Sequence, residues 1–251
     1  MEDTHPCKAL EACLVLRHNA WRPSLEAPKP DLGFVEARLR RRLSMLSSMA
    51  LHVLHGLGPL PPHTPLFFAS FRGELAQQLK INKMLVEEGA LLPAAFSLSV
   101  FNTPPALCSM ALGLCAGYSA LYPPEGRFSC ALVAAAAALQ APSGPASTLP
   151  SPSPSPLPSG MSPLNHLAFV YAEEALGAEY ASLQQGIPGE ALAFALLLAG
   201  PVPPGEKEAG GPTTERGGFR LSRVPPGDCA CPGRFLAALE AAGGGGGEAH
   251  V

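Results

Sequence analysis

Charged residues are scarce in this sequence. They make up 15% of its 251 residues, whereas hydrophobic residues make up 47%, and the net charge is -3. The sequence therefore has no basic surface of the kind that nucleic-acid binding requires, and we expect no nucleic-acid partner. With so little charge to cover a solvated surface, we expect the chain to bury part of its surface against another protein.

Long apolar runs are also missing. The two longest, 130–139 and 191–200, fall well short of the roughly 20 residues that a membrane-spanning helix needs. Residues 1–13 mix acidic, histidine and lysine side chains and lack the apolar centre of a signal peptide. We therefore expect no membrane span, and we expect a cytoplasmic location.

The cysteines match no paired zinc-binding motif. There are seven, an odd number: Cys7, Cys13, Cys108, Cys115, Cys130, Cys229 and Cys231. In a reducing compartment such residues usually serve as small buried apolar side chains. Only Cys130 lies near the start of an expected helix, where a thiolate would be stabilised. Its neighbours are apolar, which favours a buried structural role for it too.

Motifs of catalysis and of metal binding are absent as well. No G-x-S-x-G sequence marks a serine hydrolase, and the glycines at 243–247 have no following helix or lysine that would hold phosphate. His52 and His55 lie one helical turn apart, but no carboxylate accompanies them, so a surface or core role is favoured over a metal pair. The residues alone predict no catalytic group, no metal and no cofactor.

One basic cluster stands out, formed by Arg38, Arg40, Arg41 and Arg42. Three interpretations remain open. The cluster is a docking patch for an acidic partner, a solvated helix face (the favoured interpretation), or a cluster from which Arg42 or a neighbour turns inward to pair with a carboxylate such as Glu74.

Apolar periodicity predicts alternating helices and strands, and hence an α/β fold. We expect helices over 36–56, 74–88, 104–113, 129–140 and from Pro232, and strands over 66–70, 119–122, 166–174 and 190–201. The alanine-rich helix 129–140 should be packed on most sides. The Pro/Ser-rich segments 141–163 and 203–217 are expected to be flexible insertions in a single domain that spans 1–251.

Seven segments carry a specific family resemblance. In chain order they read RRRLSMLSSMAL, FASFRGE, PAAFSLSVFN, ALGLCAGYSAL, CALVAAAAAL, HLAFVYAEE and PGRFLAALEA, and they extend over 14–240. Together they resemble the N-terminal half of the β-ketoacyl synthases, and in particular the short chain-length-factor-like proteins of aryl polyene and similar bacterial pigment pathways. The resemblance implies a thiolase-like fold with layers in the order α/β/α.

The resemblance also bears on catalysis. In active synthases of this superfamily, a strand ends in a Thr-Ala-Cys elbow that places the nucleophilic Cys at the start of a buried helix. Counted from Gly117, the matching residues are Tyr122, Pro123 and Pro124, followed by Glu125. Proline supplies no thiolate, so the resemblance implies a vestigial elbow. The two histidines of active synthases come from a C-terminal half that this sequence does not include, so no residue here is expected to take their role.

The expected function is a non-catalytic subunit that forms a heterodimer with a β-ketoacyl synthase, meets an acyl carrier protein through that complex, and shapes the acyl tunnel. The candidate contact and tunnel residues, expected in a strand and loop, are Ala95, Phe96, Ser97, Ser99, Val100, Phe101 and Asn102. The aromatic members would limit chain length by steric exclusion, although ordinary core packing explains them equally well. The alternatives are an active synthase or acyltransferase that uses Cys108, Cys115 or Cys130, and a structural or regulatory relic without acyl chemistry.

Overall fold

The computed structural model describes residues 10, 13–90, 93–124, 126–140, 166–175, 177, 189–200, 219–221, 229 and 231–243. Both Pro/Ser-rich segments, 141–163 and 203–217, lie outside the described residues. In chain order the elements are β1 (Leu14–Trp21), α2 (Ala37–Arg40), α3 (Met45–Gly56), β2 (Leu66–Ala69), α4 (Leu75–Glu88), α5 (Pro93–Ser97), α6 (Thr103–Leu112), β3 (Tyr118–Leu121), α7 (Ser129–Gln140), β4 (His166–Glu173), β5 (Leu192–Ala199), β6 (Phe219–Arg220) and α8 (Pro232–Gly243).

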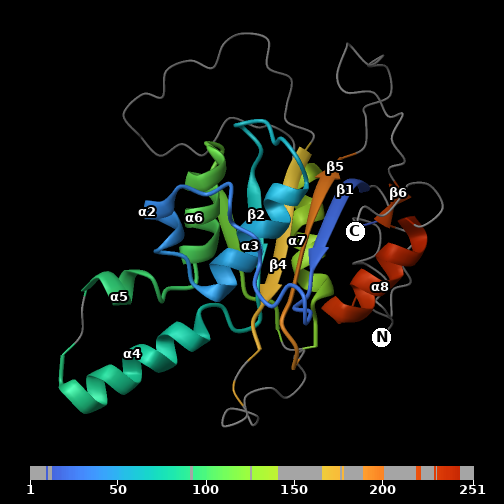
Figure 1. The fold of residues 1–251 in the computed structure, drawn as a ribbon. Helices are drawn as coiled ribbons and strands as arrows, with labels where there is room; N and C mark the ends of the chain where they lie inside the picture. Colours follow the sequence, from blue (N-terminus) through green and yellow to red (C-terminus); the bar gives the residue numbers. More distant parts are fainter. Residues whose placement is uncertain are drawn as a thin grey trace, which may run out of the picture.

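The strands form one six-stranded sheet in the order β3-β2-β4-β5-β1-β6 (Figure 1). β3, β2 and β4 are parallel, whereas β5 is antiparallel to β4, and β1 is antiparallel to β5 and β6. Parallel strands need a crossover connection. Helices α4, α5 and α6 lie on the connection from β2 to β3, and α7 lies on the connection from β3 to β4. The carboxyl ends of β2, β3 and β4 therefore lie at one edge of the sheet.

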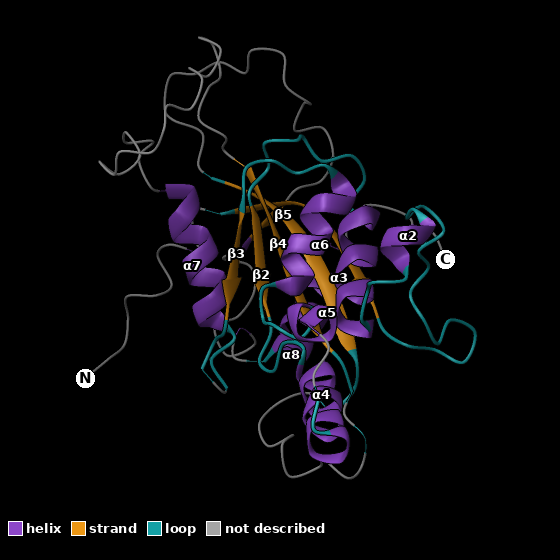
Figure 2. Ribbon diagram, turned by 90° about the vertical axis from the view of Figure 1, so that its left-hand side faces the viewer, coloured by secondary structure: helices purple, strands orange, loops and turns teal. Residues whose placement is uncertain are grey.

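Helices cover both faces of the sheet (Figure 2). Large side chains of the central strands, such as Phe169 and Phe194, belong to the core that includes α7 and α8. Small ones on the opposite face, such as Ala168 and Ala195, belong to the core that includes α3 and α6. Small residues allow a close approach of α3 to the sheet. The predicted layered α/β/α fold is confirmed.

Most predicted elements are present, but the single helix predicted over 36–56 is wrong. The chain forms two helices there, α2 and α3, separated by residues 41–44. Ser44 interrupts the helix because it adopts an extended backbone and its Oγ accepts the Ser47 backbone N–H at 2.9 Å, which caps the start of α3. The end at Gly56 was predicted correctly.

The packing predicted for the alanine-rich helix is also wrong. α7 buries one face, with Ala131, Leu132, Ala135 and Ala136 turned to the core, and leaves Cys130, Ala137 and Ala138 exposed. The core covers only one side of this helix, because α7 flanks the sheet next to the edge strand β3 (Figure 2).

Within the described part of the chain, no helix is both long enough and apolar enough to cross a membrane.

Candidate functional site

The carboxyl edge of the parallel strands brings together the segments that sequence and resemblance single out. β2 runs into residues 70–74, β3 runs into the elbow at Tyr122, and β4 ends in Glu173. This is the edge at which α/β proteins most often place their ligands, because loops rather than continuing strands follow there.

A buried ion pair joins the ends of β2 and β4. Arg72 Nε lies 2.8 Å from Glu173 Oε1, and the two side chains are 5% and 0% exposed. Glu173 Oε2 accepts the Phe71 backbone N–H at 2.8 Å and the Ser70 hydroxyl at 3.1 Å. Arg72 Nη2 also donates to the Glu174 carbonyl at 3.1 Å. The turn after β2 is therefore folded around one carboxylate from β4.

A second carboxylate, Glu74, joins the same region to α3. Its Oε1 accepts the hydroxyls of Ser44 at 2.6 Å and Ser47 at 2.9 Å, and the residue is fully buried. The pairing of Glu74 with Arg42 that the sequence left open is wrong, because Arg42 is exposed and the two serines occupy the carboxylate.

Carboxylates outnumber the cation in this cluster. Glu74, Glu173 and Glu174 are buried beside the single guanidinium of Arg72. Burial raises the pKa of Glu173, although Arg72 opposes that shift, and burial also raises the pKa of Glu74. Burial, helped by the neighbouring carboxylates of Glu74 and Glu173, raises the pKa of Glu174 to about 7. The site therefore favours uptake of a proton.

The sequence did not identify this polar cluster. Its only local sign is the position of charged residues directly after apolar strands, in FASFRGE and VYAEE.

Burial of the phenol and the nearby Glu173 charge hold the pKa of Tyr171 well above its usual range, so its hydroxyl stays protonated.

The candidate contact residues do not form a strand, so that part of the prediction is wrong. Ala95, Phe96 and Ser97 lie in helix α5, and Ser99, Val100, Phe101 and Asn102 lie in the turns before α6. Local hydrogen bonds stabilise this shape: Ser97 Oγ donates to the Ala94 carbonyl at 3.0 Å, and Thr103 Oγ1 donates to the Ser97 carbonyl at 3.0 Å. No neighbouring strand is needed.

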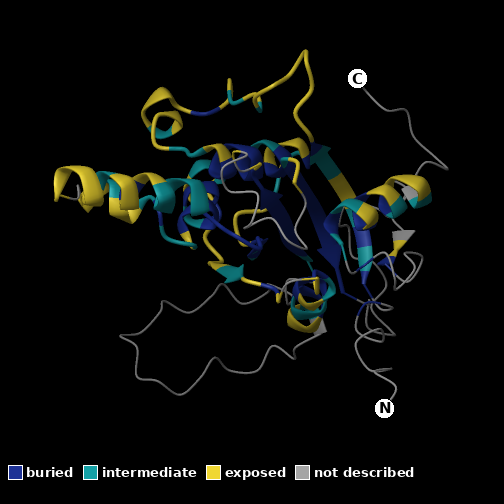
Figure 3. Cartoon of the chain, turned by 90° about the horizontal axis from the view of Figure 1, so that it is seen from below, coloured by how far each residue is buried: buried dark blue, intermediate teal, exposed yellow. Residues whose placement is uncertain are grey.

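Helices α4 and α5, with residues 75–90 and 93–97, form an arm that extends from the sheet to the lower left of Figure 1. Ile81 is the one buried residue of α4, and the exposed end of the arm is visible in yellow in Figure 3. Three large apolar side chains of the arm are exposed: Leu85, Val86 and Phe96, at 48%, 86% and 56%.

Phe101 contacts the predicted elbow directly. Its ring centroid lies 5.5 Å from that of Tyr122 and 5.9 Å from that of Phe68, both in edge-to-face geometry. Gly73 makes this position possible, because a Cβ atom there would collide with the Phe101 ring and the backbone φ is +57°. The structure thus places one candidate tunnel residue against one elbow residue.

The elbow lies in the connection between β3, which ends at Leu121, and α7, which begins at Ser129, close to the bounds expected from the sequence. Tyr122 is 66% exposed, Pro123 is buried and Pro124 is exposed, whereas Glu125 lies outside the described residues. Phe128, fully buried, anchors the far end of the loop.

The alternative nucleophiles differ in exposure. Cys108 is fully buried, and burial raises the pKa of its thiol far above the usual range; burial raises the pKa of Cys13 to about 11. Cys115 and Cys130 are exposed, so the buried role predicted for Cys130 is wrong. α7 turns that residue away from the core.

The histidine pair on α3 makes no metal site. His52 Nδ1 lies 2.9 Å from the Asp31 carbonyl, and the His55 ring stacks on Phe34 at 3.5 Å between centroids. Among the described residues, no three His, Cys, Asp or Glu side chains are grouped closely enough to bind a metal ion.

The outer edge of β3 is unpaired in the described part of the sheet. Figure 2 looks onto this edge and shows β3 between α7 and α6, with the arm projecting on the same side of the molecule. Exposed large apolar side chains accompany the edge: Met110 on α6, Tyr118 on β3 and Tyr122 at the elbow, at 65%, 40% and 66%. We call this surface, with the exposed arm residues, the edge face.

Comparison with known proteins identifies a family and a fold. The model of the family described as "Beta-ketoacyl synthase, N-terminal domain" matches residues 16–156, more than half of the chain. No curated protein is significantly similar in sequence. A solved structure described as "Ketosynthase (ApeO) in Complex with its Chain Length Factor (ApeC) from Xenorhabdus doucetiae" is similar with a TM-score of 0.54 and 19% identity, over 76% of this chain and 80% of that chain. The predicted thiolase-like fold is confirmed.

Proposed function

Since this chain belongs to the family of β-ketoacyl synthase N-terminal domains, we propose that it is a chain-length-factor-like subunit. In this proposal it pairs with a full β-ketoacyl synthase, does not catalyse condensation itself, and meets the acyl carrier protein through the complex. The product would be a polyene or polyketide-like chain, as in aryl polyene biosynthesis.

The edge face is the observation that carries the proposal. An edge strand with unpaired backbone groups and exposed aromatic side chains is a surface that stable proteins usually cover. Here β3 exposes such an edge, and Met110, Tyr118 and Tyr122 surround it. A partner synthase that lies against β3 and under the arm would bury all three side chains. The chain-length factor in the similar solved structure is likewise in complex with a ketosynthase.

The elbow supports a non-catalytic role. Its described residues, 122–124 and 126–128, contain neither a cysteine nor a histidine. Cys130 lies on the exposed side of α7, and Cys108 is buried with a neutral thiol. A condensing enzyme needs a thiolate close to a base, and no side-chain base is hydrogen-bonded to either cysteine in the described part of the chain.

Partner binding is tested with a co-expressed β-ketoacyl synthase. Tyr122→Glu should weaken capture of the synthase at least tenfold, because it places a charge in an apolar interface. Leu25→Glu, at a fully exposed position in the chain after β1, a strand that three others separate from β3, is the control and should bind normally. A chain that is a monodisperse monomer and captures no synthase would exclude the proposal. Labelling of one cysteine by a condensing-enzyme inhibitor, with loss of activity, would favour the active-enzyme alternative.

Chain-length control is tested separately, through the products of the complex. Phe101→Ala should shift the product mixture towards longer chains, because a shortened wall leaves room for further methylenes, each worth about 0.8 kcal/mol of burial. Mass spectrometry of the released chains measures this. A shift towards longer chains would identify Phe101 as a tunnel residue. An unchanged product distribution, in a complex that still forms, would assign Phe101 to core packing only.

A further inference from the structure

We infer that, when no synthase is present, two copies of this chain join their sheets by antiparallel pairing of β3 with β3, with Ser119 of one copy opposite Ser119 of the other. The pairing itself does not depend on the proposed function. Its displacement by a synthase does rest on that proposal, because both partners would use the edge face.

The inner edge of β3 is occupied by β2, to which it is parallel. The Leu66 backbone N–H donates to the Gly117 carbonyl at 3.2 Å, and the Ser70 backbone N–H donates to the Leu121 carbonyl at 3.3 Å. The N–H and C=O groups of successive strand residues point alternately to the two sides of the strand. Residues 117, 119 and 121 therefore direct their backbone groups at β2.

Tyr118 and Ala120 consequently direct their backbone N–H and C=O groups away from β2. In the described part of the chain no strand lies on that side, so four hydrogen-bonding groups lie at an open edge. Within β3, one antiparallel register uses all four. In it Tyr118 of each copy lies opposite Ala120 of the other, and each such pair exchanges two hydrogen bonds. Ser119 then lies on the two-fold axis, opposite itself.

The edge carries none of the charges that would repel a second copy. A two-fold axis brings identical charges of identical chains together, and natural proteins often protect an exposed edge strand with lysine or with a covering segment. Residues 113–124, GLCAGYSALYPP, contain no charged residue. None of the four residues of β3 is buried, whereas β1, β2, β4 and β5 all contain buried residues. An uncharged, self-complementary edge favours a second copy over a partner recognised by its charge.

Apolar side chains beside β3 would complete the interface. Met110, Tyr118 and Tyr122 are exposed at the edge onto which Figure 2 looks. A ladder of four residues is not sufficient for a stable dimer, because stable interfaces bury about 1,200–2,000 Å² in total. The two-fold axis brings these three side chains of both copies to the same interface, where their burial adds the hydrophobic contribution that the ladder lacks.

Analytical ultracentrifugation of the full chain without a synthase tests the pairing. The wild-type chain should sediment as a dimer that dissociates on dilution. Ser119→Lys should weaken the dimer at least tenfold, because two lysines would lie opposite each other across the axis, and circular dichroism should show an unchanged fold. A wild-type chain that is monomeric at every soluble concentration, or a dimer that Ser119→Lys leaves unchanged, would overturn the inference.

A charge exchange tests the register. Ser119→Glu alone should dimerise as weakly as Ser119→Lys, whereas an equimolar mixture of the two variants should regain the dimer, because opposite charges then lie across the axis. Ser24→Lys and Ser24→Glu make the same changes at an exposed position after β1 and should dimerise like the wild type, alone and mixed. A mixture of the Ser119 variants that stays monomeric would exclude the register in which Ser119 lies opposite itself.

Addition of a β-ketoacyl synthase separates this inference from the proposed function. If the synthase binds the same edge, the dimer should be replaced by complexes that each contain one copy of this chain. A dimer that forms but captures no synthase would support the inference and contradict the proposed function. A monomeric chain that captures the synthase would do the reverse.

Discussion

Replacing Arg72 with Met should lower the free energy of unfolding by about 3–5 kcal/mol, because the buried Glu173 carboxylate loses its cation. The expected loss is far larger than for a surface ion pair, which contributes only about 0–1 kcal/mol. Both side chains are buried, and the turn after β2 donates to the same carboxylate through Phe71 and Ser70. Urea denaturation followed by circular dichroism measures the loss.

Arg127→Met is the matched control, since Arg127 is exposed, and it should change stability by no more than about 0.5 kcal/mol. The double variant Arg72→Met/Glu173→Gln should recover part of the loss, because the orphaned charge is removed as well. If Arg72→Met were as mild as the control, Glu173 would have to be neutral in the folded protein.

Elements with a strong local pattern could be predicted from the sequence. The boundaries of α7 and the C-terminal end of α4 follow from apolar spacing and from Gly89, which ends α4 in a left-handed conformation. β1 was not predicted. Its sequence, LVLRHNAW, has polar residues at its centre and only weak alternation. Its place in the sheet comes from pairing with β5, at the other end of the chain, which no local window contains.

The difference between local patterns and contacts between distant segments also separates the two parts of the candidate site. Phe101 and Tyr122 were singled out from a resemblance carried by contiguous segments, and the structure places them in contact. The ion pair of Arg72 and Glu173 joins residues 101 positions apart, and it forms only because β2 and β4 are neighbours in the sheet. The strand expected among the candidate contact residues is wrong for the opposite reason: local side-chain hydrogen bonds of Ser97 and Thr103 decide the backbone there.

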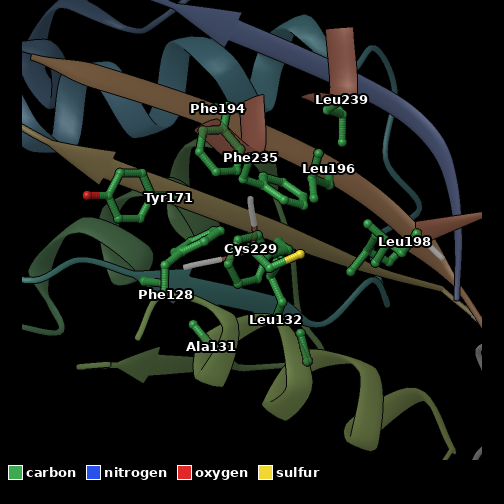
Figure 4. Close-up of a cluster of buried hydrophobic side chains, with 14 of the residues drawn as sticks. Phe128, Ala131, Leu132, Tyr171, Phe194, Leu196, Leu198, Cys229, Phe235 and Leu239 are labelled. Carbon is green, nitrogen blue, oxygen red and sulfur yellow. The ribbon is translucent and has the colours of Figure 1, made fainter. Parts of the chain in front are cut away.

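Replacing Phe128 with Ala should also cost about 3–5 kcal/mol of stability, the usual range for a buried Phe-to-Ala change. Phe128 is fully buried at the end of the elbow loop. Its ring lies 5.3–6.1 Å from the rings of four other aromatic residues, three of them labelled with it in Figure 4: Phe169, Tyr171, Phe194 and Phe235. Truncation would leave a cavity between β4, β5 and α8, because rings held on three separate elements cannot all move in to fill it.

Phe96→Ala is the control for this prediction. It is the same chemical change at a side chain that is 56% exposed, so stability should fall by less than about 1 kcal/mol. The comparison also tests why the elbow loop is retained. If Phe128 holds residues 122–128 in place for a partner, Phe128→Ala should lose synthase capture under conditions where circular dichroism still shows a folded chain. Equal losses of stability in the two variants would mean that the aromatic cluster reorganises freely, and the shape of the elbow would then not depend on Phe128.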